Sequence, residues 1–353
     1  MAAGPAGRLA ADDRGPGVDR LAIAMRAVLP TSDPPDPRPR LGELPDPVPA
    51  AGEVLVAVRA AGLNRADLMQ LRGHYPPPPG ESDVPGLELS GEVVSVGEGV
   101  AGWEPGQRVM ALVAGGGQGE LAAVPAGQLM AMPEGLSFVE GAAIPEAGLT
   151  AWTNLVAEGG LAAGETVLIS GANGGVGTFT VQLAAELGAF VLAAGRDLSR
   201  LEPLRDLGAA ELLLLDDGLP ARVRELTGGR GADLALDLVG GEHLARMLAA
   251  LAPLGRLVLI GLTAGSRAEL DLRRILSLRL RLIGSALRTR PRPEKASLGA
   301  AFAEFALPRL ADGRLRPVVD RVFRFEQAAE AYAALEVGGV AGKLVLEMRP
   351  DHG

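Results

Sequence analysis

The chain has 353 residues, a formal net charge of −9 and 48% hydrophobic residues. This length is typical of two domains of ordinary size, each with enough apolar residues to fill a core. The negative charge argues against a general nucleic-acid-binding surface, and no apolar run is long enough to span a membrane. With no cysteine and only three histidines, the sequence excludes disulfides and cysteine-bound zinc and argues against a histidine-rich metal site. We therefore expect a soluble, cytoplasmic protein without a cysteine-bound or histidine-rich metal site.

The start of the chain differs in composition from the rest. Residues 1–24 are rich in Ala, Gly, Asp and Arg and lack the apolar stretch of a secretory signal. They offer little surface to bury, so we expect a disordered N-terminal extension. Residues 30–50 are rich in proline, which predicts an extended surface segment.

Residues 53–135 alternate and break in the way that short strands do. The segments 54–58, 91–96 and 108–112 are rich in strand-forming residues, and Gly and Pro separate them. This pattern predicts a compact, β-rich domain, which we place at residues 25–147.

From residue 148 onward, strand-like and helix-like segments alternate. The candidate strands are 166–170, 190–195, 211–215, 233–238, 256–261 and 280–285, and the candidate helices are 176–187, 198–207, 219–226 and 242–251. This alternation is typical of an α/β fold with a doubly wound parallel sheet, so we predict a Rossmann nucleotide-binding domain at residues 148–291.

The last part of the chain contains two further helices and two extended segments. The pattern predicts helices at about 296–311 and at 326–336, an extended piece near 318–323 and a final strand at 343–347. That strand has no obvious place in the nucleotide-binding domain. We therefore expect residues 292–349 to return to the first domain and complete it.

The segment 166–177 carries the strongest functional signal. An aliphatic and β-branched run leads into a glycine turn, and small residues at 172, 174 and 177 match the pattern G-x-G-x-x-G with Ala first. Small residues permit a tight turn, close approach of a pyrophosphate and close packing of helix on strand. A helix N-terminus then offers free N–H groups to the phosphates. We predict that the dinucleotide contacts Ala172, Gly174, Gly175, Val176 and Gly177; a plain tight turn is the alternative.

The end of the second strand of this domain indicates which dinucleotide binds. An NAD site would place a carboxylate here for the ribose 2′-hydroxyl, whereas this chain has Gly195 followed by Arg196. Asp197 lies at a helix start and is interpreted as a cap. Arg196 and Arg200 can form charge-assisted bonds to a 2′-phosphate, so we predict NADPH. The alternative is that both arginines are solvated helix residues.

Several short motifs, in a fixed order, resemble one superfamily. They are 61–69, 73–80, 86–91, 143–147, 149–151, the glycine turn and 342–346. The chain resembles the medium-chain dehydrogenase/reductases over about residues 25–348. Within them it resembles the zinc-independent, zeta-crystallin-like quinone oxidoreductases, specifically the tumour-suppressor-inducible quinone oxidoreductase branch. The resemblance implies a GroES-like catalytic domain beside the Rossmann domain.

Two positions depart from the zinc-dependent members of that superfamily. Where those enzymes carry the catalytic-zinc Cys, this chain has Asn64, and where they carry the His of Gly-His-Glu, it has Leu87. Neither side chain suits zinc, so the resemblance implies hydride transfer without a metal.

Two residues are candidates for catalysis. Hydride addition to a quinone creates an oxyanion, which a hydrogen-bond donor stabilises. Tyr75, in a proline-rich loop, is expected to stack on the acceptor ring and the cofactor and to donate; an ordinary loop tyrosine is the alternative. Asn64 is expected to donate to the acceptor or the nicotinamide ribose, or else to cap a helix, and the sequence does not choose between these roles.

The resemblance implies further cofactor contacts. They are Thr150, Gly261, Leu262, Leu287 and Lys343, and the segments 261–262 and 285–288 are expected to flank the nicotinamide. The alternatives are a helix-surface hydroxyl for Thr150 and a surface ammonium for Lys343. The alternative for the last segment is that residues 280–286 are only an edge strand, which could pair with its copy in a homodimer.

Three functions are compatible with these residues. The leading prediction is an NADPH-dependent quinone oxidoreductase. An enone or enoyl reductase would use the same geometry, and a non-catalytic NADPH-binding protein would use the same fold. No residue separates quinones from enones.

Overall fold

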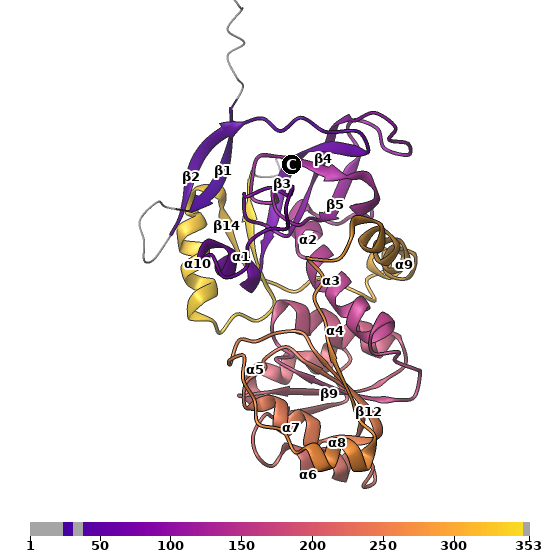
Figure 1. Ribbon diagram of the computed structural model, residues 1–353. Coiled ribbons are helices and arrows are strands. Elements are labelled where there is room, and N and C mark those ends of the chain that lie inside the picture. Colours follow the sequence, from indigo (N-terminus) through magenta and orange to yellow (C-terminus); the bar gives the residue numbers. More distant parts are fainter. Residues whose placement is uncertain (1–23, 31–37, 349–353) are drawn as a thin grey trace, which may run out of the picture.

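The computed structural model of the protein describes residues 24–30 and 38–348. In that part of the chain the strands form three sheets of two, seven and six strands. Figure 1 shows the β-rich domain, which contains the two- and seven-stranded sheets, above a nucleotide domain built around the six-stranded sheet. The predicted disorder of residues 1–24 falls almost wholly outside the described residues.

The six-stranded sheet is parallel throughout. Its strands are β8 (Thr166–Ser170), β9 (Phe190–Gly195), β10 (Glu211–Leu214), β11 (Ala232–Asp237), β12 (Leu251–Leu259) and β13 (Arg281–Gly284). Their order is β10-β9-β8-β11-β12-β13, so the direction of winding reverses between β8 and β11, as in dinucleotide-binding folds. Every residue of β8 is buried, because helices cover both faces of a parallel sheet. The predicted α/β fold is confirmed.

Helices connect these strands. They are α4 (Gly175–Glu186), α5 (Leu198–Leu201), a 3₁₀ helix (Glu202–Leu207), α6 (Leu219–Leu226), α7 (His243–Ala249) and α8 (Leu272–Leu278). The helix predicted at 198–207 is divided at Glu202, where a 3₁₀ helix begins whose second residue, Pro203, lacks an N–H group. The predicted cap is confirmed, because the Asp197 side chain accepts from the Ser199 N–H at 2.9 Å. Helix α8 was not predicted.

The seven-stranded sheet forms the centre of the β-rich domain. Its strands are β3 (Glu53–Leu63), β4 (Glu88–Val96), β5 (Arg108–Leu112), β6 (Leu121–Pro125), β7 (Leu129–Ala131), β14 (Val319–Arg324) and β15 (Lys343–Glu347). Strand β15 pairs antiparallel with β3, with Leu344 opposite Leu63. The smaller sheet pairs β1 (Ala24–Pro30) with β2 (Pro39–Pro45), so part of the proline-rich segment is a paired strand.

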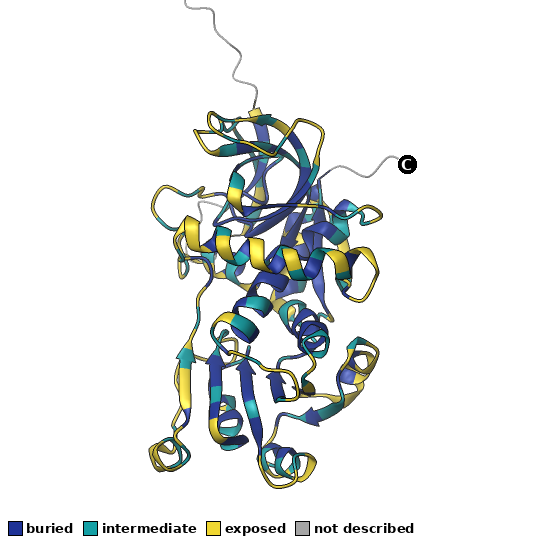
Figure 2. Cartoon of the chain, turned by 90° about the vertical axis from the view of Figure 1, so that its right-hand side faces the viewer, coloured by how far each residue is buried: buried dark blue, intermediate teal, exposed yellow. Residues whose placement is uncertain are grey.

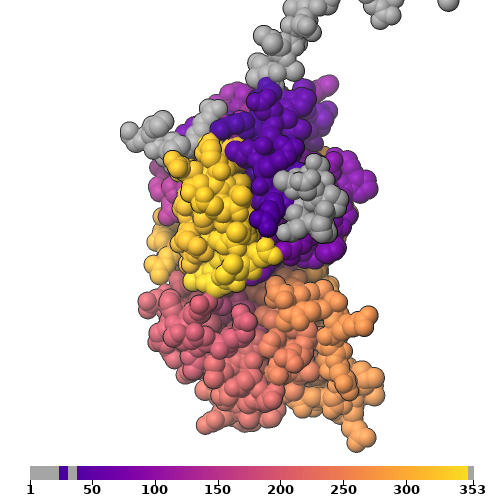
Figure 3. Space-filling view, turned by 90° about the vertical axis from the view of Figure 1, so that its left-hand side faces the viewer, coloured from indigo at the N-terminus to yellow at the C-terminus, as the bar shows by residue number. Residues whose placement is uncertain are grey.

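Helices pack around this sheet and toward the nucleotide domain. They are α1 (Arg65–Leu71), α2 (Phe138–Ala142), α3 (Pro145–Trp152), α9 (Arg292–Ala311) and α10 (Ala328–Val337), with a π-helix (Thr153–Ala157) and 3₁₀ helices (Ala126–Gln128, Phe325–Gln327). Figure 3 shows α10, in yellow, on the same face as the N-terminal strands. None of the described helices is long and apolar enough to cross a membrane.

The two domains share one continuous hydrophobic core at their junction. The Phe302 ring of α9 lies 6.1 Å from Phe179 of α4 and 6.4 Å from Trp152 of α3, between ring centroids. Gly148 of α3 is required here, since a Cβ at that position would lie 2.4 Å from the Phe302 ring. In Figure 2, α9 turns its buried face toward this core, and β13 is the exposed edge strand of the lower sheet.

Candidate functional site

The glycine turn between β8 and α4 uses its small residues for different purposes. A Cβ on Gly177 would lie 2.4 Å from the Gly171 carbonyl oxygen and 2.6 Å from the Ala172 carbonyl carbon, so this glycine lets the helix pack closely on the strand. A Cβ on Gly174 would meet nothing closer than 3.5 Å. The backbone at Gly174 therefore leaves open space beside it, as a bound phosphate requires.

The start of β15 lies directly against this turn. The Gly342 N–H donates to the Asn173 carbonyl at 2.9 Å, and a Cβ on Gly175 would lie 2.3 Å from Lys343 Cδ. Only 4% of Lys343 is exposed, so it is not a surface lysine. The lysine stem thus lies between the dinucleotide turn and the β-rich domain.

The Lys343 side chain ends in an ammonium group that lies in a buried polar cluster. Lys343 Nζ donates to the Leu63 carbonyl at 3.0 Å and to Asn64 Oδ1 at 2.7 Å, and it forms an ion pair with Glu88. Asn64 Nδ2 donates to Glu88 Oε1 at 2.9 Å, and the Glu146 N–H donates to Glu88 Oε2 at 2.9 Å. Both charges are therefore paired and hydrogen-bonded, which a buried ion pair needs for stability.

Asn64 occupies the helix-cap position, which is one of the two roles that the sequence left open. It is the N-cap residue of α1, and its backbone N–H donates to Asp67 Oδ2 at 2.8 Å. Its amide carbonyl and one amide N–H are already engaged by Lys343 and Glu88. A direct contact between Asn64 and a ligand would use the remaining amide hydrogen.

The zinc positions of related enzymes have different chemistry in this chain. Asn64 joins the lysine cluster, and Leu87 is a buried aliphatic side chain. These residues do not fit a zinc ion, which prefers Cys, His or carboxylate ligands. Within residues 24–30 and 38–348, no group of three or more His, Cys, Asp or Glu side chains could hold a metal.

Two carboxyl groups at the cluster have strongly perturbed acidity. Burial raises the pKa of Asp67 to about 7, although Asp67 also accepts from the Gly86 N–H at 3.3 Å. Burial and the charge of Glu88 raise the pKa of Glu146 to about 7, and Thr150 Oγ1 donates to Glu146 Oε1 at 3.4 Å. Both groups can hold a proton near neutral pH, which is common at functional sites.

Tyr75 is held in place by an arginine from the far end of the nucleotide sheet. Arg288, which follows β13, donates to the carbonyls of Tyr75 and Ala114, each at 2.8 Å, and to Gln70 Oε1 at 2.6 Å. Its guanidinium carbon lies 5.0 Å from the centroid of the Tyr75 ring, within the range of a cation–π interaction. Burial, and then the charge of Glu146, raises the pKa of the Tyr75 hydroxyl. The phenol therefore stays protonated and able to donate.

The resemblance placed residues 285–288 beside the nicotinamide, but no role was predicted for the Arg288 side chain itself. The sequence places it only in a run after the sixth strand, and its partners lie more than 170 positions earlier in the chain. A lone arginine carries no local signal of such contacts, so only the folded structure reveals its position.

The predicted 2′-phosphate residues lie at the end of β9. Gly195 is buried, whereas Arg196 and Arg200 are exposed. Arg200 Nε lies 3.8 Å from Asp197, and a Cβ on Gly339 would lie 2.8 Å from Arg200 Nη1. The Arg200 side chain thus reaches toward the loop that precedes β15. Arg196 has no hydrogen bond or ion pair within the described residues.

The remaining predicted cofactor residues occupy three places. Thr150 is buried on α3 beside Glu146, and Leu287 is buried in the shared core. Gly261 and Leu262 follow β12, and a Cβ on Gly261 would lie 2.4 Å from the Leu238 carbonyl oxygen. Leu262 is half exposed.

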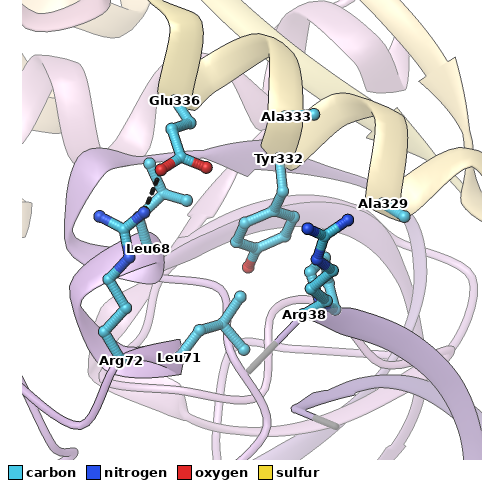
Figure 4. Close-up of a pocket in the computed structure, with 9 residues that line it drawn as sticks. Arg38, Leu68, Leu71, Arg72, Ala329, Tyr332, Ala333 and Glu336 are labelled. Carbon is cyan, nitrogen blue, oxygen red and sulfur yellow. Dashed lines mark hydrogen bonds and ion pairs between the residues drawn. The ribbon is translucent and has the colours of Figure 1, made fainter. Parts of the chain in front are cut away.

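A separate pocket of about 240 Å³ lies in the β-rich domain between α1 and α10. Figure 4 shows Tyr332 beside Leu68 and Leu71, with an ion pair between Arg72 and Glu336 at its edge. None of the predicted site residues lines this pocket.

Comparison with known proteins identifies the family. A model of the zinc-binding dehydrogenases matches residues 175–303, and a model of the alcohol dehydrogenase GroES-like domain matches residues 50–134. The quinone oxidoreductase-like protein 2 homolog of Nematostella vectensis is 30% identical over 299 residues, which cover 83% of this chain and 81% of that protein. The chain belongs to the medium-chain dehydrogenase/reductase superfamily.

Other similar proteins differ greatly in length. A phenolphthiocerol/phthiocerol polyketide synthase chain of Mycobacterium tuberculosis is 33% identical over 304 residues, or 84% of this chain, but the match spans only 14% of that protein. A mycobacterial structure complexed with NADPH is 29% identical, with a TM-score of 0.78, over 88% of this chain and 95% of that one. This medium-chain dehydrogenase/reductase is thus similar both to whole oxidoreductases and to a segment of a much longer synthase.

Proposed function

We propose that this protein is an NADPH-dependent quinone oxidoreductase that transfers hydride to its acceptor without a metal. The observation that carries the proposal is the place of Lys343. Its stem packs on the glycine turn, and its ammonium is fixed by Asn64 and Glu88 of the β-rich domain. This arrangement ties a dinucleotide-binding turn to a set of buried proton-holding groups.

The chain's own residues would orient the cofactor. The small residues Ala172, Gly174, Gly175 and Gly177, with Val176 at the helix start, would receive the pyrophosphate. When bound, NADPH supplies the hydride. Thr150, Gly261, Leu262 and Leu287 would contact the nicotinamide end of the cofactor. The NADPH-bound mycobacterial relative supports this choice of cofactor.

Tyr75 would act on the acceptor. Its protonated phenol can donate to the oxygen on which negative charge develops, and its ring can stack on a planar acceptor. Arg288 fixes the loop by bonding the Tyr75 carbonyl. The quinone oxidoreductase-like relative supports a quinone as that acceptor.

Steady-state turnover of Tyr75→Phe with one quinone at saturating NADPH tests this role. The variant keeps the ring and loses the donor, so kcat should fall while NADPH affinity changes little. The fall should be modest, because a hydroquinone anion is already delocalised. Unchanged kcat/KM in both Tyr75→Phe and Tyr75→Ala would show that Tyr75 is not part of the site.

Treatment with EDTA tests whether the reaction needs a metal. Activity that survives extensive treatment would support metal-free transfer, and rescue of lost activity by zinc would contradict it.

A second test concerns the cofactor. Replacing both Arg196 and Arg200 by alanine should weaken NADPH binding and leave NADH binding nearly unchanged. Each charge-assisted bond is worth roughly 1.5–3 kcal/mol when desolvated, and the exposure of both arginines makes a smaller loss the expectation. The ratio of kcat/KM for NADPH over NADH measures the effect. An unchanged ratio in the double variant would show that neither arginine recognises the 2′-phosphate.

The second candidate function is reduction of an enone or enoyl substrate. The likeness to a segment of a polyketide synthase favours it. Glu146 and Asp67, which hold protons near neutral pH, suit a reaction that must protonate carbon. Turnover on a panel of quinones and enones separates the two candidates. NADPH binding without any turnover would instead indicate a non-catalytic NADPH-binding protein.

A further inference from the structure

Arg288 begins at the edge of the nucleotide sheet where dinucleotides bind. The chain leaves β13 through Ser285, whose N–H donates to the Leu259 carbonyl of β12 at 3.1 Å. Because the strands of this sheet are parallel, residues 285–288 leave it at the same edge as the glycine turn that follows β8. In such sheets the ligand lies outside the carboxyl ends of the strands. The backbone of Arg288 therefore belongs to the side of the nucleotide domain that receives the cofactor.

The Arg288 side chain crosses from this edge into the β-rich domain. Its three guanidinium nitrogens donate to the carbonyls of Ala114 and Tyr75, each at 2.8 Å, and to Gln70 Oε1 at 2.6 Å. Only 5% of Arg288 is exposed. A guanidinium is rigid and planar, so three bonds made at once fix the Tyr75 loop relative to the nucleotide domain.

The Tyr75 loop has few donors of its own. Residues 76–79 are four consecutive prolines, which have no N–H group. The His74 and Tyr75 N–H groups both donate to the Met69 carbonyl, at 2.8 and 3.2 Å, which ties the start of the loop to α1. Beyond that point the loop can be held only through its carbonyls and side chains. Arg288 supplies the donor for the Tyr75 carbonyl.

A second arginine holds the far end of the same loop. Arg292, the first residue of α9, pairs with Glu81 at 3.1 Å and with Glu53 at 3.0 Å. Both partners belong to the β-rich domain, and 45% of the Arg292 side chain is exposed, so this contact is the weaker of the two. Of the two arginines, Arg288 is the one that joins the Tyr75 loop to the cofactor side of the nucleotide sheet.

We propose that Arg288 is a positioning residue that couples the two binding sites, so that NADPH binding strengthens acceptor binding through the Tyr75 loop. This inference rests on the proposed reductase function and adds an interaction between its two substrates. A cofactor in contact with residues 285–288 restricts where Arg288 can lie, and Arg288 in turn fixes the carbonyl and the ring of Tyr75. The acceptor then binds to a tyrosine that is already in place, which lowers the entropic cost of binding.

Hydrogen exchange of the full chain with and without NADPH tests this coupling. A peptide spanning residues 73–80 reports mainly on His74 and Tyr75, because residues 76–79 have no amide hydrogen. In wild-type protein NADPH should slow this exchange at least about fivefold, the lower end of the usual coupling between sites. In Arg288→Met NADPH should bind without slowing the exchange. Arg288→Lys should recover part of the effect, since an ammonium can still donate to the Tyr75 carbonyl.

Arg292→Met is the matched control, because it loosens the same loop from within the β-rich domain. Exchange should be faster in this variant, but NADPH should slow it as in wild type. A merely structural role for Arg288 would give the same result in Arg288→Met. A wild-type loop that does not respond to NADPH, or a full response in Arg288→Met, would overturn the proposal. Should Arg288→Met fail to fold, an undiminished response in Arg288→Lys would overturn it.

Binding of 1,4-naphthoquinone measures the same coupling from the acceptor side, because coupling between two ligands is reciprocal. NADP⁺ cannot reduce the quinone, so calorimetry can follow both ligands in one complex. NADP⁺ should tighten naphthoquinone binding at least about fivefold in wild type and in Arg292→Met, but not in Arg288→Met. Equal naphthoquinone affinity with and without NADP⁺ in wild type would overturn the proposal. In turnover, Arg288→Met should raise KM for the quinone and leave KM for NADPH nearly unchanged.

The two measurements separate this proposal from the proposed function. If naphthoquinone neither binds nor reacts while the exchange response to NADPH still depends on Arg288, the quinone reductase function is wrong and the coupling stands. If naphthoquinone is reduced and the response to NADPH does not depend on Arg288, the function stands and the coupling is wrong. Failure of wild-type protein to bind NADPH would overturn both.

Discussion

The glycine turn and the Lys343 cluster meet at the domain junction but are built in opposite ways. The turn is local, since residues 171–177 make it from backbone and from the absence of side chains. The cluster is assembled from Asn64, Glu88, Glu146 and Lys343, which lie up to 279 positions apart in the chain and bury their charges together. A local backbone site tolerates change around it, whereas a buried charge network depends on every member.

Removal of Lys343 should have the largest effect. Lys343→Met leaves Glu88 buried without its cation, which typically costs about 3–5 kcal/mol, and it also removes the contact on Gly175. Urea unfolding measures the loss. The double variant Lys343→Met/Glu88→Gln should recover part of the stability, because the unpaired charge is gone. A single variant as stable as the wild type would mean that the cluster contributes little.

The raised pKa of Glu146 should make stability depend on pH. Between about 4.5, its ordinary pKa, and about 7, Glu146 is protonated only in the folded protein, so stability falls as pH rises through this window and levels off above it. At about 1.4 kcal/mol per unit, the loss is at most about 3.5 kcal/mol.

Glu146→Gln should therefore be more stable than wild type at pH 8 and show a flatter profile between pH 5 and 8. Glu304→Gln, an exposed change on α9, is the matched control and should keep the wild-type slope. Melting temperatures across this range provide the measurement. A wild-type profile in Glu146→Gln would show that Glu146 is ionised throughout the window.

Replacing each of two glycines of the turn by alanine should separate the effect on packing from the effect on dinucleotide binding. Gly177→Ala meets backbone atoms 2.4–2.6 Å away and should cost about 1–3 kcal/mol of stability. Gly174→Ala faces open space, so the fold should be nearly unchanged while dinucleotide affinity falls. Melting temperature and NADPH titration of both variants measure the two effects. Equal destabilisation by both would contradict this division of roles.

The sequence alone predicted most of the nucleotide domain. Buried parallel strands appear as short apolar runs, and the glycine turn is a local pattern, so β8, α4 and the fold class were correctly predicted. The cap role of Asp197 was equally local. The boundaries were less accurate near β12, which begins at Leu251 where a helix was expected to end.

Only the tertiary structure decided how the junction is built. Lys343 looks like an ordinary lysine until β15 pairs with β3 and brings it to Asn64 and Glu88. Arg288 has no local signature either, because its hydrogen-bond partners come from segments distant in the chain. Burial and charge pairing are properties of the assembled domains. The sequence could therefore name Tyr75 and Asn64 as candidates, but which charges surround them follows from the packing of the two domains.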